Sequence, residues 1–326
     1  MTSPNAQAAA TIRAMRHDDL TATADLLVLS AGDDKRHRLL ERLASTDADE
    51  IHHAIVAERA GVIVGAGKII TEPAWPGTVA ALVAVAPHER GRGIGTALAD
   101  ELATWARSNL GRQHVVTSTL RDDLERGREF AARYGLTVTH HSVGWRFDLA
   151  GRGDELTERA ARGADTAGVR VRVADFWAEE AMVLDCITRS LPGLPVPGAE
   201  DQDVDVSQAH RLFTDDAVVL LAEPRDVPGS PPCGLTIVTP QGDGSDWYTV
   251  YTGVAVDHRG RGVATALKAA ALREAHRRGA TAVSTHNDDG NEAILRTNRT
   301  FGMQPSVGYW SLTRRDDIRD DRRRNG

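Results

Sequence analysis

One pattern occurs twice in this chain, and it constrains the fold more than any other feature. Residues 82–107 (LVAVAPHERGRGIGTALADELATWAR) and 252–277 (TGVAVDHRGRGVATALKAAALREAHR) each read as an apolar strand, a turn rich in Arg and Gly, and a helix. With Arg90 aligned to Arg259, the two segments match from strand to helix without a gap. The repeat predicts two copies of one fold.

The segments around the repeat also recur in the same order. Each half opens with a strand and a helix start, continues with a strand hairpin, and closes with a strand, a helix and a last strand. Antiparallel strands before the central helix favour an α+β class, in which each domain has a mixed, mostly antiparallel central sheet flanked by helices. We therefore expect tandem domains at 1–150 and 169–314, a polar linker without apolar periodicity at 151–168, and a charged tail at 315–326.

Composition excludes several classes of function. A net charge of −7 over 326 residues does not favour a nucleic-acid partner. The two cysteines, Cys186 and Cys233, are too few for a disulfide framework and too scattered for a zinc site. No segment has a signal-peptide layout, and no apolar run approaches the roughly 20 residues that span a bilayer. We expect a cytoplasmic monomer or homodimer without metal or membrane partner.

The repeated turn has the features of an anion site. Backbone N–H groups at a helix N-terminus point outward, and the helix dipole favours negative charge. Glycines allow the backbone to approach a ligand closely, and arginines add charge-assisted bonds to phosphate, so a pyrophosphate is the expected ligand. The dinucleotide fingerprint is not met, because Thr96 and Thr265 stand where its third glycine belongs, and the Gly-Lys-Ser/Thr of a P-loop is absent.

The pattern R-x-x-G-x-G/A and the later helix endings FAARYGL and TNRTFGM resemble the GNAT superfamily of N-acetyltransferases. The layout is similar to tandem GNATs that form mycothiol, modify antibiotics or tailor natural products. The resemblance implies that the turn binds the pyrophosphate of acetyl-CoA, or another acyl-CoA, and that the preceding strand pairs with pantetheine. It assigns cofactor binding to Val85, Arg90, Gly91, Arg92, Gly93, Ile94, Gly95 and Thr96, and to Val254, Ala255, Val256, Arg259, Gly260, Arg261, Gly262, Val263, Ala264, Thr265 and Asn291.

The two halves differ in the residues available for chemistry. Acyl transfer to an amine needs the amine neutral and a proton for the leaving thiolate. The resemblance implies a tyrosine acid four residues before the glycine of the last helix, but Ala131 and Asn298 occupy these positions. The central strand of the N-terminal half carries no titratable group. We expect that half to be a structural or vestigial copy that still holds CoA; a second working active site is the alternative.

The C-terminal half supplies the catalytic candidates. Three residues compete as general base: Glu223, Asp246 and His286. The acid candidates are Tyr248 and Tyr251, although strand tyrosines commonly serve the core. Asn291 and Asn298 stand seven apart on one helix face, and we expect them to contact pantetheine or a water. Amides bonded to neighbouring backbone are the alternative.

An insertion in the second half bears on the acceptor. Residues 189–206 are Pro-rich and then acidic, and Glu200, Asp201, Asp203 and Asp205 would attract a cationic amine. A solvated loop and a pocket for a longer acyl chain are the alternatives. The sequence therefore predicts a CoA-dependent N-acyltransferase, most simply an N-acetyltransferase, acting on a primary amine of a small molecule. The alternatives are a CoA-binding sensor without turnover and a protein N-alpha-acetyltransferase.

Overall fold

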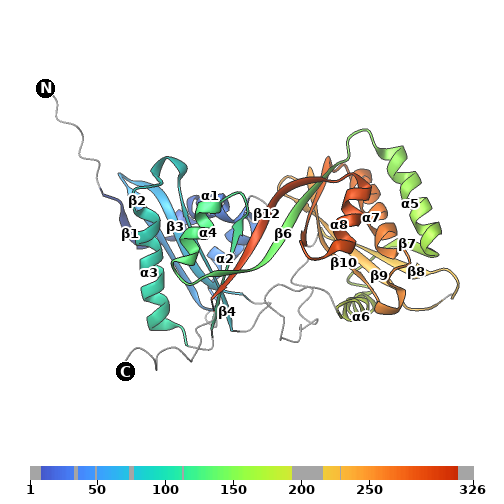
Figure 1. The fold of residues 1–326 in the computed structure, drawn as a ribbon, viewed down its shortest axis with the longest axis horizontal. Coiled ribbons are helices and arrows are strands. Elements are labelled where there is room, and N and C mark those ends of the chain that lie inside the picture. The colour runs from blue at the N-terminus through green and yellow to red at the C-terminus, as the bar shows by residue number, and fades with distance from the viewer. Residues whose placement is uncertain are drawn as a thin grey trace. The chain divides into compact units, whose positions relative to one another are not determined.

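A computed structural model describes residues 9–32, 36–47, 50–72, 77–111, 114–192, 216–227 and 229–314 of the chain. The chain divides into two units, one made of residues 1–141 and 309–326 and the other of residues 142–308. Figure 1 shows a sheet flanked by helices in each unit. This α+β architecture is the one predicted from the repeated segments.

Unit 1 is built on five strands of the N-terminal half. The sheet order is β1-β2-β3-β4-β5, antiparallel except for the parallel pair β4–β5. The apolar residues of α1 and α2 pack on one face and those of α3 on the other, because successive strand residues point to opposite faces. The bounds are β1 Thr11–Ala14, η1 His17–Asp19, α1 Leu20–Ala31, α2 Arg36–Ala44, β2 His52–Arg59, β3 Val62–Thr71, β4 Thr78–Val85, η3 Pro87–Glu89, α3 Ile94–Asn109, β5 Val115–Arg121 and α4 Glu125–Ala132.

Unit 2 repeats the plan with the order β7-β8-β9-β10-β11, in which only β10–β11 is parallel. The apolar residues of α5, α7 and α8 cover one face, and those of α6 cover the other. The bounds are α5 Gly153–Ala167, β7 Val169–Ala174, α6 Glu180–Ser190, β8 Val218–Pro224, β9 Gly234–Gln241, β10 Asp246–Val254, η5 Val256–His258, α7 Val263–Arg277, β11 Ala282–Asp288 and α8 Glu292–Phe301.

The predicted linker at 151–168 is instead mostly helix α5. Leu156, Ala160 and Ala164 are buried at a spacing of four residues, so the segment has an apolar stripe, made mostly of alanine, along one helix face. The stripe packs on α7 so closely that a Cβ on Gly163 would lie 3.2 Å from the Ala266 backbone. Residues 151–168 therefore belong to the core of unit 2. The predicted tail at 315–326 lies outside the described residues.

The last strand of each half differs most from expectation, because each is exchanged. Strand β6 (Thr137–Asp148) closes the N-terminal half, yet its residues 142–148 pair antiparallel with β11 in unit 2. Strand β12 (Gln304–Arg314) closes the C-terminal half, yet its residues 309–314 pair antiparallel with β5 in unit 1. Each unit therefore completes its sheet with a strand from the other half, and the unit boundaries fall inside β6 and β12.

Truncation tests this exchange. Ending the chain after Gly308 removes Tyr309 and Leu312, which are 7% and 1% exposed in unit 1 and should contribute about 1.5 to 3 kcal/mol each. It also frees the β5 edge. We expect the β5 amides to lose hydrogen-exchange protection while the β8 and β9 amides of unit 2 keep theirs. Ending the chain after Arg314 is the control. Unchanged β5 protection after the longer truncation would contradict the exchange.

Candidate functional site

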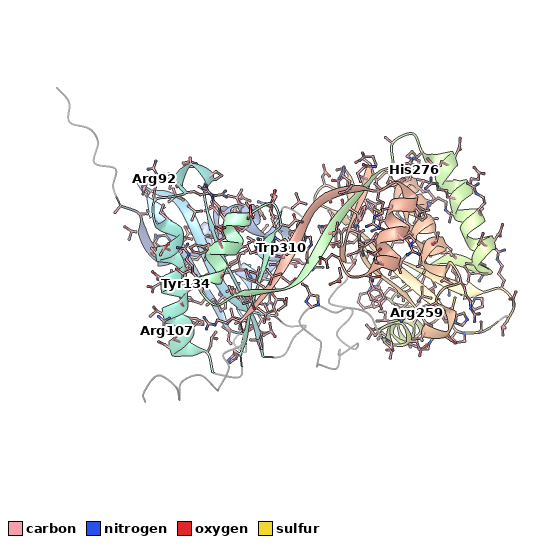
Figure 2. The ribbon with its side chains drawn as sticks, viewed as in Figure 1. Arg92, Arg107, Tyr134, Arg259, His276 and Trp310 are labelled. Atoms are coloured by element: carbon pink, nitrogen blue, oxygen red, sulfur yellow. The ribbon has the colours of Figure 1, made fainter. Side chains whose placement is uncertain are left out.

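The turns between β4 and α3 and between β10 and α7 have the same backbone conformation. Gly91 and Gly260 have φ of +78° and +74°. Gly93 and Gly262, at the helix N-caps, have φ of +82° and +83°. Such positive values favour glycine, so the backbone geometry accounts for the two glycines in the R-G-R-G sequence of each turn. Figure 2 labels Arg92 in the first turn and Arg259 in the second.

Both turns leave a helix N-terminus open. No side chain caps α3 or α7, and their first helical bonds run from Ala97 to Gly93 O and from Ala266 to Gly262 O. The preceding N–H groups of each first turn are therefore left for another acceptor. A Cβ on Gly93 would meet nothing within 4 Å, and one on Gly262 would meet only the Ala167 Cβ at 3.9 Å. Each turn has room and donors for a phosphate.

The first arginine of each turn has a structural contact. The Nε atoms of Arg90 and Arg259 donate to the last carbonyls of their strands, Val85 O and Val254 O, at 3.0 Å in both cases. Arg259 also donates from Nη2 to Ser190 O at 2.8 Å, which fixes the end of α6 beside the turn. These arginines therefore fasten strand to turn, and phosphate contact by them stays a prediction.

The central strand of each unit separates from its parallel neighbour partway along. β10 pairs with β11 only from Asp246 to Tyr248, and β4 pairs with β5 only from Thr78 to Ala80. Beyond these points each central strand continues toward its turn while pairing with the antiparallel neighbour. The freed edge presents backbone donors and acceptors to an extended ligand.

Only the second unit's central strand carries a bulge among the described pairs. The β10–β9 register shifts between Thr249 and Tyr251, so Val250 is an extra residue. The β3–β4 register runs without a shift over its described pairs. Because of the bulge, Val250 and Tyr251 both pack toward the α6 face. The strands of the two units thus differ where they separate from their neighbours.

Tyr248 and His286 meet where β10 and β11 separate. Tyr248 Oη lies 3.1 Å from His286 Nδ1, and His286 Nε2 lies 3.0 Å from Val307 O on β12. A carbonyl only accepts, so Nε2 of the neutral ring carries the proton and Nδ1 accepts from the Tyr248 hydroxyl. Two of the predicted catalytic residues are therefore hydrogen-bonded to each other.

The other acid candidate, Tyr251, lies apart from this pair. Its hydroxyl is 2.7 Å from Ser190 Oγ, and its ring packs against the apolar residues of α6. Burial raises its pKa. Tyr251 therefore has the core role that was the alternative.

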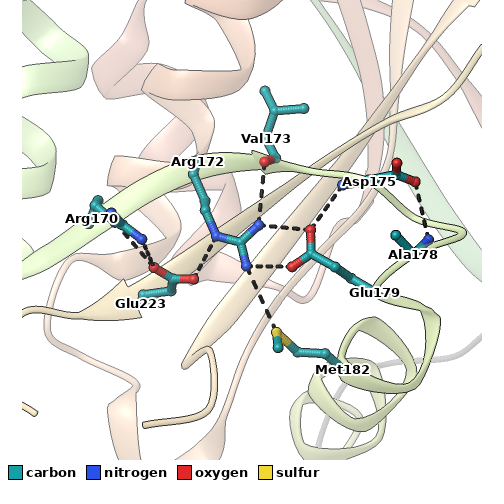
Figure 3. A network of polar contacts seen from close by, with 8 residues as sticks. All are labelled: Arg170, Arg172, Val173, Asp175, Ala178, Glu179, Met182 and Glu223. Carbon is teal, nitrogen blue, oxygen red and sulfur yellow. Dashed lines mark hydrogen bonds and ion pairs between the residues drawn. The ribbon is translucent and has the colours of Figure 1, made fainter. Parts of the chain in front are cut away.

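The base candidate Glu223 is held by two arginines (Figure 3). Arg172 Nε donates to Glu223 Oε1 at 2.6 Å, and Arg170 Nη2 donates to Oε2 at 2.7 Å. Arg172 also binds both carboxylate oxygens of Glu179 at the start of α6. Burial opposes ionisation of Glu223, but the arginine hydrogen bonds outweigh it and lower its pKa. A carboxylate stabilised in this way is a poor proton acceptor.

Unit 1 contains a matching network, with Thr11 at the position of Arg170. Arg13 Nε donates to Glu58 Oε2 at 2.8 Å, and the Arg13 Nη atoms bind the Asp19 carboxylate before α1. Thr11 faces Glu58 across β1–β2, as Arg170 faces Glu223 across β7–β8. A device present in both units ties the edge strand to the first helix, so its presence at Glu223 indicates structure.

Asp246, the third base candidate, is also paired. Arg146 on β6 donates to its carboxylate oxygens at 2.9 and 3.1 Å, and this bond raises the pKa of the arginine. Asp246 starts β10, two residues before Tyr248 on the same side of the strand. Arg146 comes from the other half of the sequence, where no local motif marks it, so sequence reasoning missed it.

The asparagines of α8 have different roles. Asn291 caps the helix, its Oδ1 accepting from Ile294 N at 3.4 Å, so the backbone-bonded alternative applies. Asn298 is fully buried and donates from Nδ2 to Asn287 Oδ1 at 2.8 Å. Its own Oδ1 is buried without a partner among the described residues. Such an acceptor is costly unless a ligand or water completes it.

A buried amine lies near the same helix. Lys268 on α7 is 6% exposed, and its Nζ contacts Met303 Sδ at 3.3 Å. Burial lowers its pKa to about 8. Counting from the aligned turns and helix ends, unit 1 has Ala99 and Ala131 where unit 2 has Lys268 and Asn298. Unit 2 therefore buries polar groups on α7 and α8 at positions where unit 1 has alanine.

Three expectations about partners concern other parts of the chain. The acidic positions 200, 201, 203 and 205 lie outside the described residues. The described residues contain no group of three or more His, Cys, Asp or Glu side chains placed to hold a metal ion. No helix among them is long and apolar enough to cross a membrane.

A family model of acetyltransferases, the GNAT family, matches residues 18–136 and 188–303. The chain belongs to the GNAT family. It is therefore an acyltransferase of a family that uses acetyl-CoA. The two matched regions each contain one of the glycine turns. The open helix N-termini, the freed strand edges and the orphaned Asn298 Oδ1 fit such a cofactor in unit 2.

Relatives extend the likeness over most of the chain. The mycothiol acetyltransferase of Sanguibacter keddieii is 26% identical over 85% of this chain and 86% of its own, and that of Kocuria rhizophila is 24% identical over 80% of each. A tandem GNAT protein from the clavulanic acid biosynthesis pathway shares the fold, with a TM-score of 0.67, 22% identity, and coverage of 93% and 98% of the two chains. A GNAT from Sphaerobacter thermophilus has a TM-score of 0.68 at 17% identity over 96% of each chain.

The pairing of Glu223 yields a test with an internal control. Glu223→Gln and Glu58→Gln should each lower the free energy of unfolding by about 1 to 2 kcal/mol at pH 7. Because its folded-state pKa is depressed, Glu223 contributes stability above the ordinary carboxyl pKa and loses it as the pH falls. The deficit of Glu223→Gln should therefore shrink toward pH 3 in urea titrations. A folded Glu223→Gln protein without turnover would instead make Glu223 catalytic.

Proposed function

We propose that this chain transfers an acyl group, most simply acetyl, from acyl-CoA to a primary amine of a small molecule, and that unit 2 carries the reaction. Acyl-CoA, when bound, supplies the acyl group as an activated thioester. The observation that carries the proposal is the difference between two otherwise matching units. The bulge at Val250 and the Tyr248–His286 pair occur in unit 2, while unit 1 has a regular strand with Ala80 and Thr119 at the matching positions.

In unit 2 the residues that would hold the cofactor lie at the start of α7, on β10 and on α8. The N–H groups at the start of α7 and the exposed Arg261 side chain would bind the pyrophosphate. The freed edge of β10 between Thr249 and Val254 would pair with pantetheine. Asn298 Oδ1 lacks a partner in the described chain and would accept a hydrogen bond there. These assignments retain Val254 to Thr265 as cofactor-binding residues.

Tyr248 and His286 accept the proton that the attacking amine loses. An attacking amine must lose a proton, and a general base must lie within one hydrogen bond or one water of it. His286 Nδ1 is the acceptor in the pair, so the Tyr248 hydroxyl would take the proton of the amine as it passes its own to Nδ1. The same pair would then return a proton to the sulfur of the departing thiolate. Glu223 and Asp246 hold arginines instead, so they support the sheet around the pair.

The proposed acceptor follows from the relatives. The two curated relatives described above are mycothiol acetyltransferases, which favours a small-molecule amine over a protein terminus. We propose that unit 1 holds CoA without turnover, since its turn has the same conformation but its strands lack the pair. The CoA-sensor alternative keeps one supporting observation, because neither Ala131 nor Asn298 can act as the family's tyrosine acid.

A matched pair of glycine substitutions tests which unit works. Gly262→Glu and Gly93→Glu place the same side chain at the same positive φ, so both pay a similar strain of about 1 to 2 kcal/mol. A carboxylate at the anion site should abolish turnover in Gly262→Glu and leave Gly93→Glu active. Thiol release with acetyl-CoA and an amine panel measures this. Equal loss from Gly93→Glu in a folded protein would assign chemistry to unit 1.

The proton-transfer pair has its own test. Tyr248→Phe and His286→Gln should each lower kcat by about 10²- to 10⁴-fold while leaving the KM for acyl-CoA near its original value. Thr119→Ala, at the matching position of unit 1, should change neither constant. Steady-state kinetics measures both constants. Full activity of both variants would remove the pair from the reaction, and CoA binding without turnover on any amine would favour the sensor.

A further inference from the structure

A glycine contributed by the N-terminal half sits behind the Tyr248–His286 pair. Gly144 on β6 faces His286 directly in the antiparallel β6–β11 ladder. A Cβ at Gly144 would lie 2.1 Å from Val307 O and 2.8 Å from Val307 C. Both distances are far below van der Waals contact, and both atoms belong to backbone, which cannot rotate away as a side chain would. The site therefore requires a residue without a Cβ.

This glycine is needed for proximity rather than for its backbone conformation. Gly144 is not among the described glycines with positive φ. Because Gly144 has no Cβ, the β12 backbone can approach β6 beside His286. The carbonyl brought close in this way is Val307 O, which accepts from His286 Nε2 at 3.0 Å. Gly144 thus touches the group that decides which imidazole nitrogen carries the proton.

A second contact from the same strand supports this reading. Arg146, two residues after Gly144 on the same side of β6, binds the Asp246 carboxylate with two hydrogen bonds. Asp246 precedes Tyr248 by two residues on β10. One strand from the N-terminal half therefore positions both members of the pair, Tyr248 through Asp246 and His286 through Val307 O.

We propose that Gly144 is a positioning residue that keeps His286 as the Nε2–H tautomer, in which the unprotonated Nδ1 accepts the Tyr248 proton. The inference rests on the proposed function for its catalytic consequence, but the tautomer itself is a property of the ring that can be observed without substrate. A larger residue would push Val307 O away and release the other tautomer, in which Nδ1 carries the proton and cannot accept.

Ring nitrogen-15 NMR on the full chain tests the proposal. The His286 resonances are assigned by their loss in His286→Gln. The wild-type ring should show a protonated Nε2 and an unprotonated Nδ1, and an Nδ1–H tautomer would overturn the proposal even if no variant folds. In Gly144→Ala the signature should shift toward a mixture, and kcat should fall about 10- to 100-fold with little change in the KM for acyl-CoA.

The control is Gly67→Ala on β3 of unit 1, where an added Cβ would lie 2.9 Å from Leu102 Cδ1. It should cost stability through packing and leave the His286 signature unchanged. An unaltered signature in folded Gly144→Ala would overturn the positioning role. A shifted signature with unchanged kcat would support the positioning role while contradicting the proposed use of His286 in the reaction, so the two failures are distinguishable.

Discussion

Backbone pairing of the exchanged strands is the constraint on which the rest of the structure depends. A sheet whose last strand has no neighbour presents a row of unsatisfied N–H and C=O groups. Here β12 covers the edge of β5 in unit 1, and β6 covers the edge of β11 in unit 2. Because β4–β5 and β10–β11 pair over only three positions before separating, β5 and β11 depend on the exchanged strands for most of their pairing. At the candidate site, β11 can separate from β10 because β6 pairs with the other edge of β11.

The two units show how one backbone plan can support different chemistry. Their turns agree in φ to within a few degrees, and their Arg–Glu networks use matching positions. The differences at the candidate site lie at the strand separation and the helix interface: an extra residue at Val250, a tyrosine and histidine in place of Ala80 and Thr119, and buried polar groups in place of Ala99 and Ala131. A buried amine and an unpartnered amide oxygen both cost stability. Unit 2 carries both groups at positions where unit 1 has alanine, which is expected where local stability yields to function.

Much of the fold could be predicted because its signals are local. The glycine turns, the central strands and the helices after them follow from residue periodicity and from the φ that Gly93 and Gly262 must adopt. Strand exchange could not be predicted, because β6 and β12 have the same alternation whichever sheet they join. The same reason hid Gly144 and Arg146, whose partners are 100 or more residues away. Glu223 was misjudged because one sequence does not reveal that Arg170 and Arg172 would occupy its oxygens. The linker was misjudged because a stripe of alanines is a weak apolar signal.

In the proposed mechanism, the Tyr248–His286 pair supplies the means of proton transfer in the absence of the family's tyrosine. Asn298 comes from α8 and bonds to Asn287, on the sheet face that α7 and α8 cover. Tyr248 and His286 lie on the opposite face, because Trp247, next to Tyr248, and Val283, three residues before His286, are both in the α7–α8 core. A group on α8 and a pair on the strands thus approach the freed edge of β10 from different sides. The proposed reaction therefore uses the helix side for holding the cofactor and the strand side for moving the proton, which makes β6 of the N-terminal half part of the catalytic architecture.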